Sequence, residues 1–147
     1  MAVAAVAVSQ IIRIPEVGNL EAYLDYYIWP TTCKIVTQKH WSGHRAVDIA
    51  CGYTEIYASA EGIVIFAGWD GGYGKTIAIS HPNGSITRYS HLSEFKISLG
   101  QQVIQGEVIG IQGKSGEVRG KTGIHLHYEV WINGKKVDPL KLYSLIN

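Results

Sequence analysis

Short segments rich in β-forming residues follow one another from residue 33 onward, and turn residues separate them. We expect strands over Cys33–Thr37, Ala46–Ala50, Ile56–Ser59, Gly62–Trp69, Lys75–His81, Ser85–Ser90, Glu107–Gln112, Ile124–Ile132 and Lys136–Val137. Asn83-Gly84, the preferred pair of a tight hairpin turn, lies between two of these segments, and Asn133-Gly134 joins the last two. Strands this short and this closely spaced predict an antiparallel all-β domain.

The stretch before these strands carries the best helix pattern in the chain, over Asn19–Trp29. Apolar residues recur there at steps of three and four and give one apolar face: Leu20, Tyr23, Leu24, Tyr27 and Ile28. Asn19 is a suitable N-cap, and Pro30 is a natural stop. We therefore expect a linker and short helix over residues 1–28, followed by one domain over residues 29–147.

The composition excludes several classes of function. Of the 147 residues, 46% are hydrophobic and 17% are charged, so the chain is not a disordered tail. A net charge of +1 excludes nucleic-acid binding through a strongly basic surface. No apolar run approaches the roughly 20 residues that span a bilayer, so we expect no membrane span.

The first residues and the two cysteines each leave two interpretations open. Met1–Val8 is apolar but lacks the charged start of a secretory signal, so it is an expression scar or linker tail, or a trimmed signal remnant. Cys33 and Cys51 can pair in an oxidising compartment, or they are two small buried hydrophobic residues.

Two short stretches imitate the end of a phosphate-binding loop, at Gly74-Lys75-Thr76 and Gly120-Lys121-Thr122. That loop needs a further glycine five residues earlier, and those positions hold Trp69 and Ser115. No helix pattern follows either stretch. We therefore expect no nucleotide binding.

Two of the six histidines, His125 and His127, lie two residues apart in an apolar strand segment. Alternate residues of a strand share a face, with Cα atoms about 7 Å apart, so both rings can approach one ion, or one can bind while the other stands beside it. Burying two histidines without partners would be costly. This pair therefore indicates chemistry more than packing.

His44 and Asp48 form the second motif. On a straight strand they would lie about 13 Å apart, so they can share an ion only if the chain bends between them. Two histidines and one carboxylate would leave a tetrahedral zinc ion with a fourth position for water, as in catalytic sites. A further histidine, such as His91, then suits proton transfer or oxyanion stabilisation.

Three motifs, HRAVD at 44–48, YSHL at 89–92 and HLHYEV at 125–130, together resemble the lysostaphin/LytM-type zinc metalloendopeptidases. These enzymes cut peptide bonds in bacterial cell-wall peptidoglycan. Segments 57–69, 99–116 and 133–143 are also similar to the family, so the resemblance covers residues 29–143. The chain departs from the family pattern in KHWSGH at the first motif and in EVRGKTGI before the third. We expect these departures to affect the groove walls and the substrate specificity rather than the metal site.

The resemblance implies one Zn²⁺ ion per chain, held by His44, Asp48 and His127, with His91 and His125 as catalytic residues. It also implies mainly antiparallel sheets that form an open, barrel-sandwich-like groove with zinc on its floor. The expected substrate is a stem or cross-bridge peptide of peptidoglycan. We expect an extracytoplasmic location, in the cell envelope or secreted, and a monomer.

The remaining aromatic residues have less definite expected roles. His40 and His81 match no catalytic position. We expect His40 at the surface, with a place in the groove wall as the alternative, and His81 solvated at a hairpin tip. Trp41, Trp69 and Tyr73 are candidates either for groove walls or for ordinary packing.

Three other functions compete with the zinc endopeptidase. A non-catalytic relative that binds the wall or activates another hydrolase would typically have lost ligands, and this chain has lost none. A lipoyl-like carrier needs a lysine at a suitable hairpin tip, and none is evident. A different zinc hydrolase is the third alternative.

Overall fold

Antiparallel β-strands form nearly all of the regular structure in the computed structural model, which describes residues 20–50, 52–118 and 123–144. The strands are β1 (Val36–Gln38), β2 (Val47–Ile49), β3 (Glu55–Tyr57), β4 (Gly62–Trp69), β5 (Lys75–Ser80), β6 (Ile86–Phe95), β7 (Gln102–Val103), β8 (Val108–Gln112), β9 (Leu126–Ile132) and β10 (Lys135–Val137). Three short 3-10 helices accompany them in the described residues: η1 (Glu21–Tyr23), η2 (Gly71–Tyr73) and η3 (Pro139–Leu142).

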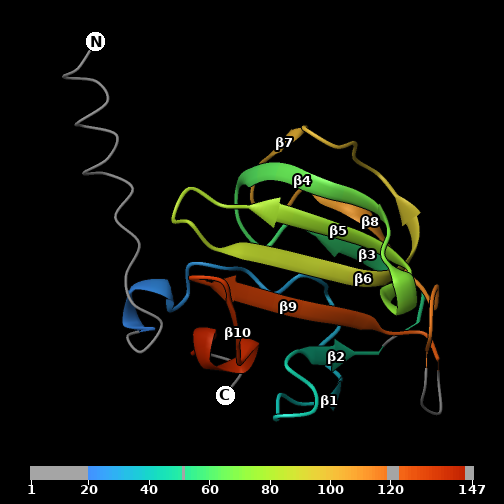
Figure 1. Cartoon of the computed structure of the whole chain (residues 1–147), viewed down its shortest axis with the longest axis horizontal. Helices are drawn as coiled ribbons and strands as arrows, with labels where there is room; N and C mark the ends of the chain where they lie inside the picture. The colour runs from blue at the N-terminus through green and yellow to red at the C-terminus, as the bar shows by residue number, and fades with distance from the viewer. Residues whose placement is uncertain (1–19, 51, 119–122, 145–147) are drawn as a thin grey trace.

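The strands form one branched, open sheet (Figure 1). Its main path runs β1-β2-β9-β6-β5-β4-β7, while β10 pairs with β9, β8 pairs with β6, and β3 pairs with β8. The expected mainly antiparallel, all-β fold is confirmed. The nine expected strands all overlap observed ones, but β7 was not expected, because a two-residue strand carries almost no pattern.

Strand β6 is longer than the sequence predicts, because it continues past Ser90 to Phe95. His91 lies inside it with a φ of 62°, in the left-handed region. The pairing of β6 with β8 shifts in register between Leu92 and Glu94. This irregularity is typical of a β-bulge, which redirects a side chain while the strand goes on.

The alternation along β9 separates the core from the site. Leu126, Tyr128, Val130 and Ile132 are fully buried in the hydrophobic core. Each such side chain contributes about 1.5–3 kcal/mol relative to an exposed one, so the register of β9 is strongly fixed. Because successive strand residues point to opposite faces, the intervening His127 and Glu129 are directed away from that core.

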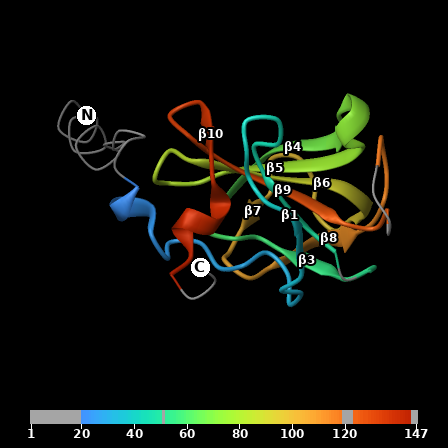
Figure 2. The same ribbon diagram turned by 90° about the horizontal axis from the view of Figure 1, so that it is seen from below.

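The N-terminal helix is much shorter than expected. The described part of Asn19–Trp29 contains only the 3-10 turn Glu21–Tyr23, and Asp25 breaks it with a φ of 56°. The Asp25 N–H donates to the Leu142 carbonyl instead of continuing a helix. Figure 2 shows this blue segment beside the red η3 helix near the C-terminus. Packing against η3 therefore overrides the helical periodicity, and Leu24 and Ile28 are exposed.

His81 corrects another expectation, because it is 4% exposed rather than solvated. Its Nδ1 donates to the Glu61 carbonyl at 2.7 Å, and its Nε2 accepts from the Thr87 hydroxyl at 2.8 Å. Burial lowers its pKa below the ordinary value, although the bond to Glu61 opposes this. His40 is half-buried.

Some expectations concern residues that lie outside the described ranges. These are the linker over residues 1–19, the N-cap Asn19, the second near-motif of the phosphate loop, and Cys51; Cys33 itself is buried. Across the described residues, we find no helix with the length and hydropathy of a membrane span.

Candidate metal centre and groove

Three side chains that are far apart in sequence meet at the junction of β2 and β9. Asp48 and His127 are direct partners in the antiparallel pairing of these strands. His44 precedes β2, and backbone hydrogen bonds of 2.9 Å join it to Trp41 in both directions. The chain also bends at Ala46, between the two residues, so His44 lies beside Asp48 rather than a strand's length away.

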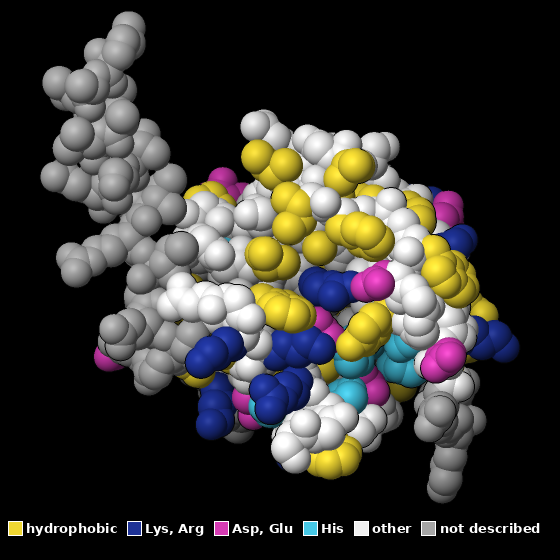
Figure 3. Space-filling model, viewed as in Figure 1, with side chains coloured by type: hydrophobic (Ala, Val, Ile, Leu, Met, Phe, Trp, Pro, Cys, Tyr) yellow, Lys and Arg dark blue, Asp and Glu magenta, His cyan; other side chains and the backbone are white. Residues whose placement is uncertain are grey.

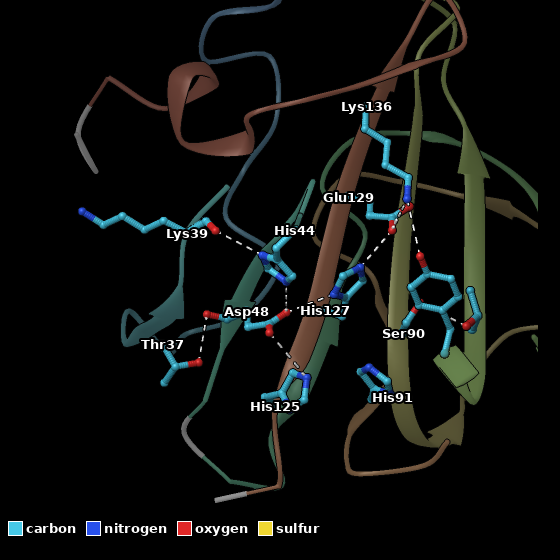
Figure 4. Close-up of polar contacts among 12 residues, drawn as sticks. Thr37, Lys39, His44, Asp48, Ser90, His91, His125, His127, Glu129 and Lys136 are labelled. Atoms are coloured by element: carbon cyan, nitrogen blue, oxygen red, sulfur yellow. Dashed lines mark hydrogen bonds and ion pairs between the residues drawn. The ribbon is translucent and has the colours of Figure 1, made fainter. Parts of the chain in front are cut away.

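One carboxylate oxygen lies at the centre of the cluster (Figure 4). Asp48 Oδ1 is 3.1 Å from His44 Nε2 and 3.0 Å from His127 Nδ1. The candidate ligand atoms of His44, Asp48 and His127 all lie within 4.8 Å of one another. The cluster could therefore bind a metal ion.

Each of the two candidate ligand histidines has a hydrogen-bond acceptor on the side away from Asp48. His44 Nδ1 donates to the Lys39 carbonyl at 3.1 Å, and His127 Nε2 donates to Glu129 Oε2 at 2.8 Å. With these protons placed outward, the inward nitrogens carry the free lone pairs that metal coordination needs. Two imidazoles and a carboxylate fit a zinc ion with one open position.

Glu129 is a buried carboxylate that the motif analysis did not single out, and it is 1% exposed. It accepts from His127, from Trp131 Nε1 at 2.8 Å and from Lys136 Nζ at 3.2 Å. Burial alone would raise its pKa, but the bond and charge of His127, with Trp131 and Lys136, lower it to about 2. Its position two residues after His127 places it on the same face of β9, so strand periodicity could have found it.

Asp48 is also held as a carboxylate. Burial opposes its ionised form, but in the absence of a metal ion hydrogen bonds from His127 and His44 lower its pKa below the ordinary range. In that state the carboxylates of Asp48 and Glu129 raise the pKa of His127 against the effect of burial. The cluster is therefore arranged to balance a positive charge at its centre.

His91 and His125 stand next to the cluster, with ring centroids 4.8 Å apart. His125 Nε2 is 3.7 Å from Asp48 Oδ2. His91 Nδ1 donates to the Ser115 carbonyl at 2.7 Å, which leaves its other nitrogen without a proton in the neutral form. Burial lowers the pKa of both rings, so both are neutral near pH 7 and able to accept a proton.

These residues line a groove of about 330 Å³, together with Gln38, Gly72, Tyr73 and Glu117. Tyr73 forms one wall, and its ring centroid is 5.2 Å from that of His127. Trp41 and Trp69 are 57% and 62% exposed and do not line the groove. The structure thus brings together all five residues of the three motifs, and of the three candidate aromatics only Tyr73 joins them.

An open set of two histidines and one aspartate, with further histidines nearby, is typical of a hydrolytic metal centre. The family model for peptidase family M23 matches residues 42–139. The chain therefore belongs to peptidase family M23, and the resemblance of its three motifs is confirmed.

Relatives and a solved structure agree with this assignment. The chain is 45% identical over 103 residues to the DD-carboxypeptidase/endopeptidase Mpg of Neisseria meningitidis. The aligned region covers 69% of this chain and 23% of Mpg. It is 36% identical over 104 residues to the peptidoglycan DD-endopeptidase ShyA of Vibrio cholerae, and this aligned region covers 70% of this chain and 24% of ShyA. The chain thus corresponds to about a quarter of the length of these relatives.

The fold is similar to that of the antimicrobial peptidase lysostaphin from Staphylococcus simulans. The TM-score is 0.68 at 23% identity, over 84% of this chain and 55% of the lysostaphin chain. At this identity the likeness concerns the fold alone.

Proposed function

We propose that this chain is a zinc-dependent endopeptidase that hydrolyses peptide bonds in bacterial peptidoglycan. The observation that carries the proposal is the His44–Asp48–His127 donor set with two unligated histidines beside it in an open groove. The activities named for Mpg and ShyA support a peptidoglycan substrate. For the same reason we propose an extracytoplasmic location, and we expect the domain to act as a monomer.

His44 Nε2, Asp48 Oδ1 and His127 Nδ1 would hold the zinc ion. When bound, zinc polarises a carbonyl and makes a water molecule acidic enough to supply a nucleophile near neutral pH. His91 and His125, whose pKa values are lowered by burial, accept the proton of that water or donate to the oxygen that becomes negative. The Ser115 carbonyl fixes the ring of His91 for this role.

Two substitutions test the roles separately. We expect Asp48→Ala to lose zinc, because it removes the carboxylate at the centre of the donor set. We expect His125→Ala to keep zinc and to lose hydrolysis by a factor of about 10²–10⁴, the usual contribution of a positioned acid or base. Zinc content by elemental analysis and release of soluble fragments from purified peptidoglycan measure the two outcomes.

Chelator treatment of the wild-type protein supplies the control, because hydrolysis should stop and return when zinc is restored. Wild-type hydrolysis by His125→Ala would refute its catalytic role. Zinc-loaded wild-type protein that binds peptidoglycan without cutting it would instead identify a non-catalytic relative.

A further inference from the structure

A second hollow of about 300 Å³ continues the groove beyond the metal centre. It shares His44, Tyr73 and His127 with the groove, and its other lining residues are Ser42, Gly43, Arg45, Glu129 and Lys136. Figure 3 shows Lys and Arg side chains gathered beside the His side chains on this face of the molecule. Two of the residues that line this hollow, Arg45 and Lys136, are basic.

Lys136 is held firmly in this hollow. Its Nζ lies 3.2 Å from Glu129 Oε2, the same oxygen that accepts from His127, and 3.4 Å from the Tyr73 hydroxyl. It also lies over the rings of Tyr73 and Trp131, at 5.8 and 5.3 Å from their centroids. An ammonium group has three donors, so one remains for a ligand after these two contacts.

Arg45 supplies a charge that no acidic group in the described part of the chain pairs with. It is exposed, and no carboxylate of the described residues lies within ion-pair distance of its guanidinium. Glu129, the acidic residue of this hollow, is already shared among His127, Trp131 and Lys136. The other part of the groove holds Glu117 instead, so the two directions along the groove differ in charge.

We propose that Arg45 and Lys136 form a carboxylate subsite, which binds a free carboxylate of the substrate peptide close to the bond that is cut. Lys136 Nζ and His127 Nε2 both contact Glu129 Oε2, so Lys136 lies close to the proposed metal ligand His127. An extended peptide advances about 3.3 Å per residue. The carboxylate therefore belongs to a residue one or two positions from the scissile bond. A guanidinium and a carboxylate match in geometry and form charge-assisted hydrogen bonds.

This inference rests on the proposed peptidoglycan substrate and makes it narrower. Peptides that carry a free carboxylate near the scissile bond should be cleaved in preference to peptides in which that group is a carboxamide. A bridge made only of residues without free carboxylates, such as an oligoglycine, should be a poor substrate.

The test compares soluble cross-linked muropeptides with the same muropeptides after conversion of their free carboxylates to carboxamides. We expect zinc-loaded wild-type protein to prefer the carboxylate form about tenfold in kcat/KM, because the carboxylate form gains a hydrogen bond between charged groups that the carboxamide form lacks. Arg45→Gln should lose this preference through a higher KM. Arg45→Lys should retain part of it.

Lys39→Gln is the matched control, because it also removes one positive charge near the site. Figure 4 shows the Lys39 side chain pointing away from His44 while its carbonyl oxygen faces that ring. This control should keep the wild-type preference. Lys136→Gln should behave like Arg45→Gln while keeping its zinc content.

A binding arm separates failure of the subsite from failure of the proposed function. Calorimetry with the His125→Ala protein should detect tighter binding of the carboxylate muropeptides than of the carboxamide forms, and Arg45→Gln in that background should abolish the difference. A preference that survives Arg45→Gln, or equal binding of both forms, would overturn the carboxylate subsite. Absence of hydrolysis with the binding difference intact would reject only the endopeptidase activity.

Discussion

Glu129 shows how one residue outside the donor set can control it. Its carboxylate accepts a hydrogen bond from His127 Nε2 at 2.8 Å, which would keep Nδ1 available for the proposed metal ion. The same oxygen lies 3.2 Å from Lys136 Nζ, so the candidate ligand His127 and the proposed carboxylate subsite share a single buried charge.

We expect Glu129→Gln to weaken zinc binding about tenfold, at the low end of the 10–100-fold typical of residues that orient metal ligands. The amide keeps the size and one acceptor but loses the charge that makes His127 more basic. Competition with a fluorescent zinc chelator measures the affinity. Glu94→Gln, which removes an exposed partner of Lys96, should leave it unchanged. Unaltered zinc affinity in Glu129→Gln would contradict this role.

The residues of the site differ in how far the sequence could predict them. His125 and His127 follow from strand periodicity, because a spacing of two fixes a common face. His44 and Asp48 required a bend between them that no residue pattern guaranteed, and the structure has it at Ala46. The proximity of Arg45 and Lys136 depends on how β10 pairs with β9, which lies beyond any local pattern.

Among the elements, the loop between β4 and β5 positions one wall of the groove through a very close backbone contact. Gly74 has a φ of 67°, and a Cβ there would lie 2.4 Å from the carbonyl carbon of Ser115. Ser115 also accepts from the Lys75 N–H and donates to the Leu92 carbonyl. Two loops are thereby locked together next to His91.

We expect Gly74→Ala to destabilise the protein by about 1–3 kcal/mol, because overpacking adds to an unfavourable φ. It should also lower hydrolysis without loss of zinc, since Ser115 would move away from His91. Urea unfolding and zinc analysis measure the two effects. Gly68→Ala is the control, because its Cβ would meet nothing closer than 3.7 Å. Equal stability of the two variants would refute the close contact.

The positions of nine strands were predictable because each of these strands carries a local pattern bounded by turn residues, as in β4, whereas the two residues of β7 carry none. The short η1 turn was not, because the helical periodicity of Asn19–Trp29 competes with long-range contacts. Tyr23 and Tyr27 are buried in the core, and the Tyr27 hydroxyl hydrogen-bonds Ser85 at 2.6 Å. No local rule anticipates a partner 58 residues away.

For the whole molecule, His81 connects the β5–β6 hairpin to the pH dependence of stability. Burial lowers its pKa in the folded state, whereas the unfolded chain has the ordinary value of about 6.5. Above pH 6.5 the neutral ring contributes fully to stability. As the pH falls below 6.5, the unfolded state takes up the proton before the folded state does, so the free energy of unfolding decreases. The decrease ends once the pH is below the lowered pKa of the folded state.

We expect His81→Gln to be less stable than the wild type at pH 7.5, because it disturbs the bonds to Glu61 and Thr87. Between pH 7.5 and 5.5, however, the variant should lose less free energy of unfolding than the wild type does. Urea unfolding at the two pH values measures the difference, to which the other five histidines contribute equally in both proteins. An identical loss in both would show that His81 does not titrate with folding.

The anchoring of Ser115 also bears on how such a domain could acquire new targets. Its three hydrogen bonds fix the chain just before segment 117–123, and the Gly113–His125 bridge fixes it at the far end. Exchanging segment 117–123 would therefore be a practical route to redirect the proposed hydrolase, since selectivity could change while the reactive centre stays intact.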